Sequence, residues 1–249
     1  MTPLILPTGQ TFFSIGPEGD VPTAIYFSLS AKESLLTDPY NQAALYLANH
    51  GVRVLSLDLP AHGDNLAATQ ALSVWADQIN HEIDPLTPFY IKVSQGIDYL
   101  ITHDMIDPNK TALIGLSRGV MIACQVAARL EKISTILGFA PLIRLHKTKE
   151  FQTIPFTTIL DRLDTFHQIP HLFNKTLRFY ISNRDTRVGT DICFEFIQHL
   201  AIEAQKHGIR SPQLELFIKY PIGMHGHGTS KETFIEGANW LLDQWKKWL

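Results

Sequence analysis

The sequence predicts a single α/β domain built on a mostly parallel, doubly wound sheet with helices covering both faces. Short apolar runs alternate with amphipathic stretches along the chain, and several of these runs are apolar at nearly every position. Strands buried on both faces of a parallel sheet have this continuous apolar character. Strands that alternate with helices favour a parallel sheet. No repeat or linker interrupts the pattern, so residues 1–249 are expected to form one domain.

Each expected strand is a short apolar run bounded by turn residues. These runs are Ala24–Leu29, Val52–Leu57, Thr111–Gly115, Thr135–Phe139, Leu177–Ile181 and Leu214–Tyr220. Helical periodicity predicts helices at about Tyr90–His103, Arg118–Leu130 and Cys193–His207. Asp38-Pro39 supplies an N-cap and a first-turn proline for a further helix that closes at Gly51.

The last helix begins with a capping-box pattern, Thr229-Ser230-Lys231-Glu232. Its apolar residues recur every three or four positions, which is typical of a buried helix face rather than of a partner-binding face. They are Phe234, Ala238, Leu241, Trp245 and Trp248.

Composition excludes several classes of protein. Hydrophobic residues make up 45% and charged residues 18%, which is typical of a globular chain and not of a disordered one. With 21 Lys and Arg against 24 Asp and Glu, no basic excess is available for nucleic acid. Cys124 and Cys193 are too few for a disulfide framework or a cysteine-rich zinc site. No apolar run is long enough for a signal peptide or a membrane span, so we expect a soluble, cytoplasmic protein.

The most informative segment is Gly115-Leu116-Ser117-Arg118-Gly119. The pattern G-x-S-x-G often arises by chance, but here an apolar run precedes it and an amphipathic stretch follows. A sharp strand-to-helix turn exposes the serine hydroxyl above the sheet, and its glycines let strand and helix approach closely. The helix start also offers N–H groups where an oxyanion would form. The alternative is an ordinary glycine-rich turn, and the context favours a nucleophile at Ser117.

A serine nucleophile needs a base and a group that orients the base. Asp185 follows the run Leu177–Ile181, at the strand end where open α/β sheets gather reactive groups, although turn and capping aspartates are also common there. After the last strand, a glycine-rich loop carries His225 and His227. Spacing from the strand favours His225, whereas the Gly-His-Gly context and the distance to the helix cap favour His227, which we take as the base. A metal site would need further ligands nearby, so we expect no metal and no cofactor.

The order Ser117, Asp185, His227 resembles the nucleophile–acid–base order of the α/β-hydrolase superfamily. Other segments extend the resemblance over most of the chain. Leu57–Gly63 is similar to the D-x-x-G-H-G turn of these enzymes, with Pro-Ala in place of Arg-Gly, and Asp185–Val188 resembles their D-x-x-V acid loop. Asp107–Lys110 is similar to the approach to the elbow in prolyl-oligopeptidase-like and dienelactone-hydrolase-like esterases.

The resemblance implies that Ser117 attacks a carbonyl carbon, His227 moves the proton and Asp185 orients the imidazole. It also implies that the N–H of Arg118 is one oxyanion donor. The second donor should come from the loop after Ala24–Leu29, where Ser28-Leu29-Ser30-Ala31 lacks the usual His-Gly, and our guess is Ser30 or one of its neighbours. Val120 stands where peptidase-like relatives tend to carry glycine, and we expect no N-terminal propeller of the oligopeptidase kind. His62 is expected to be structural.

Two long segments do not fit the strand–helix alternation, namely Asp64–Pro88 and residues 143–176. Such excursions are usually functional loops or lids. By the resemblance, residues 143–176 lie where a cap is inserted. The apolar residues of this segment either face a substrate or bury the lid against the body, and both interpretations stay open. These apolar residues are Phe151, Phe156, Ile159, Leu163, Phe166, Leu172 and Phe173. The basic run Arg144–Lys149 is expected to be a solvated face, and Arg118 is the better candidate for contact with an acidic substrate group.

We therefore expect a serine hydrolase that cleaves a carboxylic ester or thioester of a small, partly apolar substrate through an acyl-enzyme. The alternatives are an acyltransferase, a prolyl-oligopeptidase-like peptidase and a catalytically silent binding protein of the same fold. The expected partner is a small-molecule ester, with no nucleic acid and no membrane span. The sequence leaves open the natural substrate and whether the chain forms a homo-oligomer.

Overall fold

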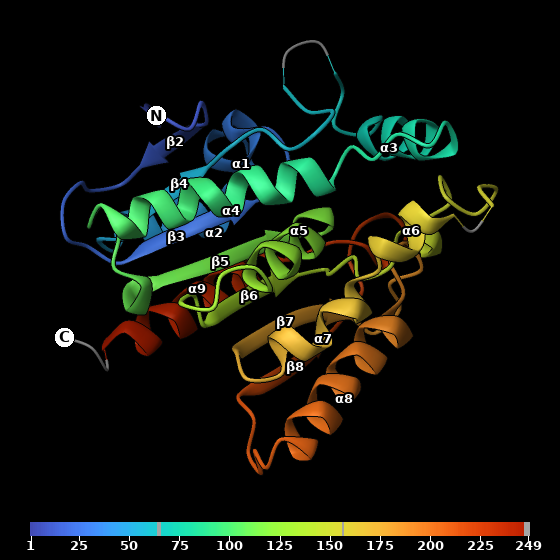
Figure 1. The fold of residues 1–249 in the computed structure, drawn as a ribbon. Coiled ribbons are helices and arrows are strands. Elements are labelled where there is room, and N and C mark those ends of the chain that lie inside the picture. The colour runs from blue at the N-terminus through green and yellow to red at the C-terminus, as the bar shows by residue number, and fades with distance from the viewer. Residues whose placement is uncertain (64–65, 156, 247–249) are drawn as a thin grey trace.

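An eight-stranded sheet forms the centre of the computed structural model, which describes residues 1–63, 66–155 and 157–246 (Figure 1). The strand order is β1-β2-β4-β3-β5-β6-β7-β8. Strands β3 to β8 run parallel, while β1 and β2 form an antiparallel hairpin that pairs with β4. The strands are β1 (Thr2–Ile5), β2 (Thr11–Ile15), β3 (Thr23–Phe27), β4 (Arg53–Ser56), β5 (Thr111–Leu116), β6 (Thr135–Phe139), β7 (Thr176–Ser182) and β8 (Leu214–Lys219). The predicted mostly parallel sheet is confirmed.

The six expected strands correspond to β3–β8, whereas β1 and β2 were not predicted. The missed hairpin lies at the sheet edge, and most of its residues are exposed or half-buried. Such strands lack the continuous apolar run that marks a buried parallel strand. The sequence signal therefore identified only the parallel part of the sheet.

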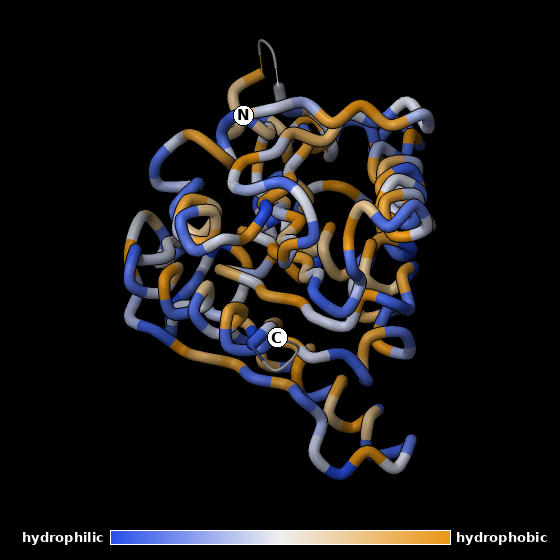
Figure 2. Tube along the Cα trace, turned by 90° about the vertical axis from the view of Figure 1, so that its left-hand side faces the viewer, coloured by the Kyte–Doolittle hydropathy of each residue, from blue (hydrophilic) through white to orange (hydrophobic). Residues whose placement is uncertain are grey.

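Helices cover both faces of the sheet (Figure 1). One face carries α1 (Ala31–Leu36), α2 (Gln42–Asn49) and α9 (Lys231–Trp245). The opposite apolar cluster contains residues of α3 (Ala71–Asn80), α4 (Thr87–Thr102), α5 (Arg118–Ala127), α6 (Thr158–Arg162), α7 (Ile169–Leu172) and α8 (Thr190–Lys206). Hydrophobic and hydrophilic residues alternate along much of the chain trace (Figure 2), as expected where helices bury one side, whereas α5 is buried from Gly119 to Ala127. Within the described ranges, no helix combines the length and the apolar character needed to cross a membrane.

Four helix starts differ from the sequence prediction. Helices α4 and α8 begin at Thr87 and Thr190, before the predicted Tyr90 and Cys193. The other two differences concern the caps. The helix expected from Asp38 begins at Gln42, because the N–H groups of Tyr40 and Asn41 both bond to the carbonyl of Thr37 and form a separate turn. The last helix is capped by Ser230, which accepts the N–H of Thr233, and not by the preceding threonine. Its predicted apolar face is buried from Phe234 to Trp245, and Trp248 lies outside the described residues.

The described residues of the segment 143–176 pack onto the body of the domain. Phe151, Leu163 and Leu172 are fully buried in the cluster beneath α5 and α8, and Ile159, Phe166 and Phe173 pack against it. Phe156 lies outside the described residues. Of the two interpretations left open by the sequence, these contacts favour apolar residues that anchor the segment.

Candidate active site

Ser117 occupies a turn between β5, which ends at Leu116, and α5, which begins at Arg118. Its backbone has a φ of 54° and a ψ of −118°, a conformation that is strained for a residue with a side chain. Three backbone hydrogen bonds hold it there: the Ser117 N–H donates to the carbonyl of Phe139 at 2.8 Å, and its carbonyl accepts the N–H groups of Val120 at 3.0 Å and Leu142 at 3.2 Å. The end of β6 and the loop after it therefore stabilise the strained turn.

The glycines on either side of Ser117 are required by close backbone contacts. A Cβ at Gly115 would overlap with the backbone of Val120, and one at Gly119 would overlap with the carbonyl oxygen of Phe27. The first turn of α5 consequently lies against the ends of both β5 and β3. This close approach directs the Ser117 side chain toward the loops that follow β7 and β8.

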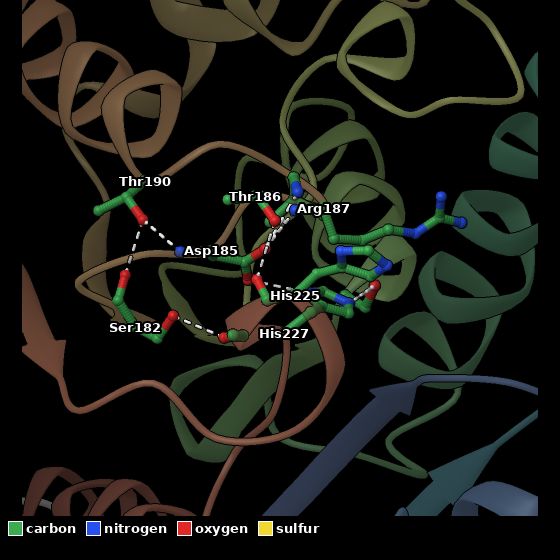
Figure 3. Close-up of polar contacts among 10 residues, drawn as sticks. Ser182, Asp185, Thr186, Arg187, Thr190, His225 and His227 are labelled. Atoms are coloured by element: carbon green, nitrogen blue, oxygen red, sulfur yellow. Dashed lines mark hydrogen bonds and ion pairs between the residues drawn. The ribbon is translucent and has the colours of Figure 1, made fainter.

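The structure brings Ser117, His227 and Asp185 together from three separate loops. Ser117 Oγ lies 2.9 Å from His227 Nε2. His227 Nδ1 lies 2.7 Å from Asp185 Oδ2, and Figure 3 shows these two residues. A carboxylate only accepts hydrogen bonds, so the His227 proton belongs on Nδ1, which leaves Nε2 free to accept the Ser117 hydroxyl proton. The side chain of Asp185 is fully buried, whereas that of His227 is 20% exposed.

The second oxygen of Asp185 is fixed by backbone donors. Asp185 Oδ1 accepts the N–H groups of Arg187 at 3.0 Å and Val188 at 3.1 Å. The Asp185 N–H bonds in turn to the hydroxyl of Thr190, which donates to the carbonyl of Ser182 at 2.7 Å (Figure 3). The carboxylate thus has a defined orientation with Oδ2 facing the imidazole.

His225 has a different position from His227. Its side chain is exposed, its φ is 61°, and its carbonyl accepts both the N–H of Thr186 at 2.9 Å and the Thr186 hydroxyl at 3.2 Å. The backbone of His225 therefore helps to join the histidine loop to the acid loop, while the imidazole of His227 meets Ser117.

A cavity of about 450 Å³ opens beside Ser117 and His227. Its apolar wall includes Leu29, Tyr40 and Phe234, and Ala68 and Thr69 of the other long excursion also line it. None of the described residues between 143 and 176 is part of this lining. No sequence pattern marked Tyr40, because its position depends on how distant segments pack, whereas residues 68–69 lie in Asp64–Pro88, one of the two long excursions expected to be functional loops.

The structure corrects the guess for the second oxyanion donor. The Ser30 N–H donates to Glu33 Oε2 at 3.2 Å and its hydroxyl donates to the same oxygen at 2.6 Å, because Ser30 caps the short helix α1. Ser28 and Leu29, not Ser30, line the cavity. The N–H of Arg118 fits the prediction better, since the first residue of a helix has no acceptor within that helix.

The Arg118 side chain turns toward His62. Arg118 Nη1 donates to the carbonyl of Ala68 at 2.8 Å and lies 3.2 Å from His62 Nε2, while His62 Nδ1 lies 2.9 Å from the carbonyl of Pro60. Burial and the neighbouring guanidinium lower the pKa of His62, and burial lowers the pKa of Arg118 to about 10. At neutral pH, a charged Arg118 therefore faces a neutral His62 that plays a structural part in this turn.

Comparison with solved structures identifies the architecture. The protein TT1662 from Thermus thermophilus aligns over 98% of this chain and 96% of its own, with 16% identity and a TM-score of 0.74. A cold-adapted esterase from an Arctic intertidal metagenomic library aligns over 98% of this chain and 92% of its own, with 17% identity and a TM-score of 0.65. The chain has the α/β-hydrolase fold.

The same fold also occurs inside longer proteins. A putative dipeptidyl aminopeptidase IV from Bacteroides ovatus aligns over 99% of this chain but only 35% of its own, with 12% identity and a TM-score of 0.68. No protein-family model matches the chain, and no curated protein sequence matches it significantly. At these identities the α/β-hydrolase fold is shared, and the reaction has to be argued from the site. In the part of the chain that the structure describes, no three His, Cys, Asp or Glu side chains gather to hold a metal ion.

Proposed function

We propose that this chain is a serine hydrolase that cleaves a carboxylic ester or thioester through an acyl-enzyme. The observation that carries the proposal is the pair of contacts from Ser117 to His227 and from His227 to Asp185, at 2.9 and 2.7 Å. A nucleophile, a base and a group that orients the base within hydrogen-bond reach are the arrangement that acyl transfer requires.

In this mechanism Ser117 Oγ attacks the carbonyl carbon while His227 Nε2 takes its proton. The buried carboxylate of Asp185 stabilises the imidazolium that forms. The N–H of Arg118 stabilises the negative oxygen of the tetrahedral intermediate. The intermediate collapses, His227 returns the proton to the leaving alcohol or thiol, and the acyl group stays on Ser117. Water, activated by His227, then releases the acid and regenerates the serine.

The cavity beside Ser117 supports a small, partly apolar substrate. Its volume of about 450 Å³ and its apolar wall of Leu29, Tyr40 and Phe234 suit a short acyl or alcohol chain. Acyl transfer to an alcohol, peptide hydrolysis and a silent binding role remain the alternatives. Cytoplasmic location stays a prediction.

The test compares initial rates on 4-nitrophenyl acetate, butyrate and octanoate for the wild type and Ser117→Ala. We expect turnover by the wild type and a loss of roughly 10³-fold or more in the variant. Ser73→Ala removes an exposed serine of α3 and serves as the control with unchanged rates. A fluorophosphonate probe should label Ser117, as located by peptide mass spectrometry.

A folded wild type that neither hydrolyses these esters nor takes up the fluorophosphonate would refute the proposal in favour of a silent binding protein. Addition of a primary alcohol separates the remaining enzyme classes. A hydrolase releases the free acid, whereas an acyltransferase yields mainly the new ester.

A further inference from the structure

A second cavity of about 380 Å³ adjoins the one beside Ser117 and shares Thr69 and Arg118 with it. Three further basic side chains line this second cavity. Lys147 and Lys149 come from the segment after β6, and Arg187 comes from the acid loop. Cations from three distant parts of the sequence therefore surround one space, which we call the cationic cavity.

A single carboxylate among the residues that line the cationic cavity partly balances this charge. Glu150 binds the Arg187 guanidinium through two hydrogen bonds of 2.8 Å each. Burial opposes ionisation of Glu150, but the hydrogen bonds with Arg187, a backbone hydrogen bond and the positive charges of Arg187 and Lys149 together lower its pKa. Glu150 therefore neutralises Arg187. Within the described ranges, Arg118, Lys147 and Lys149 form no ion pair with a carboxylate, so three positive charges remain unbalanced around the cavity.

Arg118 is the least satisfied of these cations. Its Nη1 contacts a carbonyl oxygen and a neutral imidazole, and neither carries a counter-charge. Its Nε is buried and has no hydrogen-bond partner among the residues that the structure describes. A largely buried guanidinium without an anion is costly, and an arriving anion would relieve that cost.

The position of Arg118 links the cationic cavity to the reaction site. Arg118 directly follows Ser117 in the chain, and its side chain lines both cavities. A molecule with its carbonyl at Ser117 can therefore place an acidic group in the cationic cavity while an apolar part stays beside Leu29 and Tyr40.

We propose that the cationic cavity binds an anionic group, such as a carboxylate, carried by the substrate whose ester lies at Ser117. This inference rests on the proposed hydrolase function and specifies its substrate class as acidic esters. The apolar cavity beside Ser117 accepts the uncharged part of the substrate, and the unpaired cations of the cationic cavity bind its charged part.

The experiment measures kcat/KM for two matched ester pairs at low ionic strength. In the first pair, 4-nitrophenyl hydrogen glutarate and its methyl ester, the charge lies on the acyl part of the substrate. In the second pair, 4-acetoxybenzoate and methyl 4-acetoxybenzoate, the charge lies on the alcohol part. We expect the charged member of at least one pair to be preferred roughly tenfold, and the preference to shrink as salt screens the cations. In Lys147→Met/Lys149→Met the ratio of charged to neutral kcat/KM should fall at least about fivefold.

The control is Lys92→Met/Lys206→Met, which removes the same charge from exposed positions on α4 and α8 and should leave the ratio unchanged. A ratio at or below one in both ester pairs, or an equal fall in the control, would overturn the proposal.

Calorimetric titration with glutarate separates this proposal from the hydrolase proposal, because it needs no turnover. A protein that hydrolyses neutral esters but neither prefers charged ones nor binds glutarate refutes the cationic cavity alone. A protein that is silent on every ester, yet binds glutarate in a manner lost in Lys147→Met/Lys149→Met, retains the anion site and refutes the role of Ser117.

Discussion

The Ser182 hydroxyl donates a 2.6 Å hydrogen bond to the carbonyl of Gly226 and so joins the end of β7 to the loop that carries His227. The N–H of Thr186 donates to the carbonyl of His225 across the same junction at 2.9 Å. A Cβ at Gly226 would overlap with the carbonyl oxygen of Arg184. The loop of the proposed base and the loop of the proposed acid are therefore held at a fixed separation by contacts outside the imidazole–carboxylate pair.

Ser182 is a positioning residue, and Ser182→Ala should lower kcat on a neutral 4-nitrophenyl ester by roughly tenfold. Misplacement of a catalytic group by about 1 Å can cost a hundredfold, and loss of one of several tethers should cost less. Steady-state kinetics give kcat and KM, and the pH profile of kcat/KM should shift because the imidazole–carboxylate contact loosens. If Ser182→Ala had a lower melting temperature but an unchanged kcat and pH profile, the role of Ser182 would be structural only.

The two histidines of the same loop should behave differently. We expect His227→Gln to lose roughly 10³-fold or more in kcat, because Gln cannot take the Ser117 proton. His225→Asn should stay within about threefold of the wild type, since Asn tolerates the positive φ and preserves the backbone carbonyl that Thr186 binds. The measurement is kcat on 4-nitrophenyl butyrate for both variants. If His225→Asn lost more activity than His227→Gln, His225 and not His227 would be the base.

Gly119→Ala should destabilise the fold by about 2–4 kcal/mol, because the new methyl group overlaps with a backbone carbonyl that cannot move freely. The control is Gly51→Ala, where the φ of 84° disfavours a side chain but no atom lies within 4 Å of the new Cβ. The control should cost only about 1 kcal/mol for backbone conformation. Urea unfolding gives the free energy of unfolding of both variants. Equal losses of this free energy would show that close packing at the elbow is not the reason for glycine at position 119.

Lys175 predicts a pH dependence of stability. Its Nζ donates to the carbonyls of Leu130 and Ile133, and burial lowers its pKa to about 8. The unfolded lysine keeps a pKa of about 10.4. Between these two values the unfolded state binds the proton that the folded state releases, so stability rises with pH over that interval.

The check is the free energy of unfolding in urea from pH 7 to 10 for the wild type and Lys175→Met. The wild type should gain stability relative to the variant above about pH 8. The control is Lys92→Met, which removes an exposed lysine and leaves Lys175 in place, and its free energy of unfolding should rise with pH as that of the wild type does. A flat or falling difference for Lys175→Met would contradict the expected pKa.

Local patterns made the elbow and the order of the proposed triad predictable. Ser117 lies in a five-residue motif between a strand and a helix, and each of these features is encoded within about twenty residues of sequence. Asp185 and His227 each follow a recognisable strand, and parallel strands bring their carboxyl ends to one edge of the sheet. Short-range rules were therefore sufficient for these three positions.

The supports of the triad required tertiary information. The Ser182–Gly226 bond joins residues 44 positions apart, and nothing in either local sequence marks that contact. Ser30 was misassigned because the loop after β3 folds into the six-residue helix α1, which is too short to show helical periodicity. The hairpin β1–β2 was missed for a related reason, since its partly exposed residues give no buried-strand pattern.

Several residues that line the cavity beside Ser117 come from a different part of the sequence than the proposed triad, and this bears on how such a protein can diversify. Leu29, Tyr40, Ala68 and Thr69 all precede β5, whereas the proposed triad lies entirely at or after the elbow. Changes at Tyr40, Ala68 and Thr69 can thus alter which molecules are accepted while leaving the proposed triad in place. A gene that changed only at these positions would combine a new substrate preference with an unchanged set of reacting side chains.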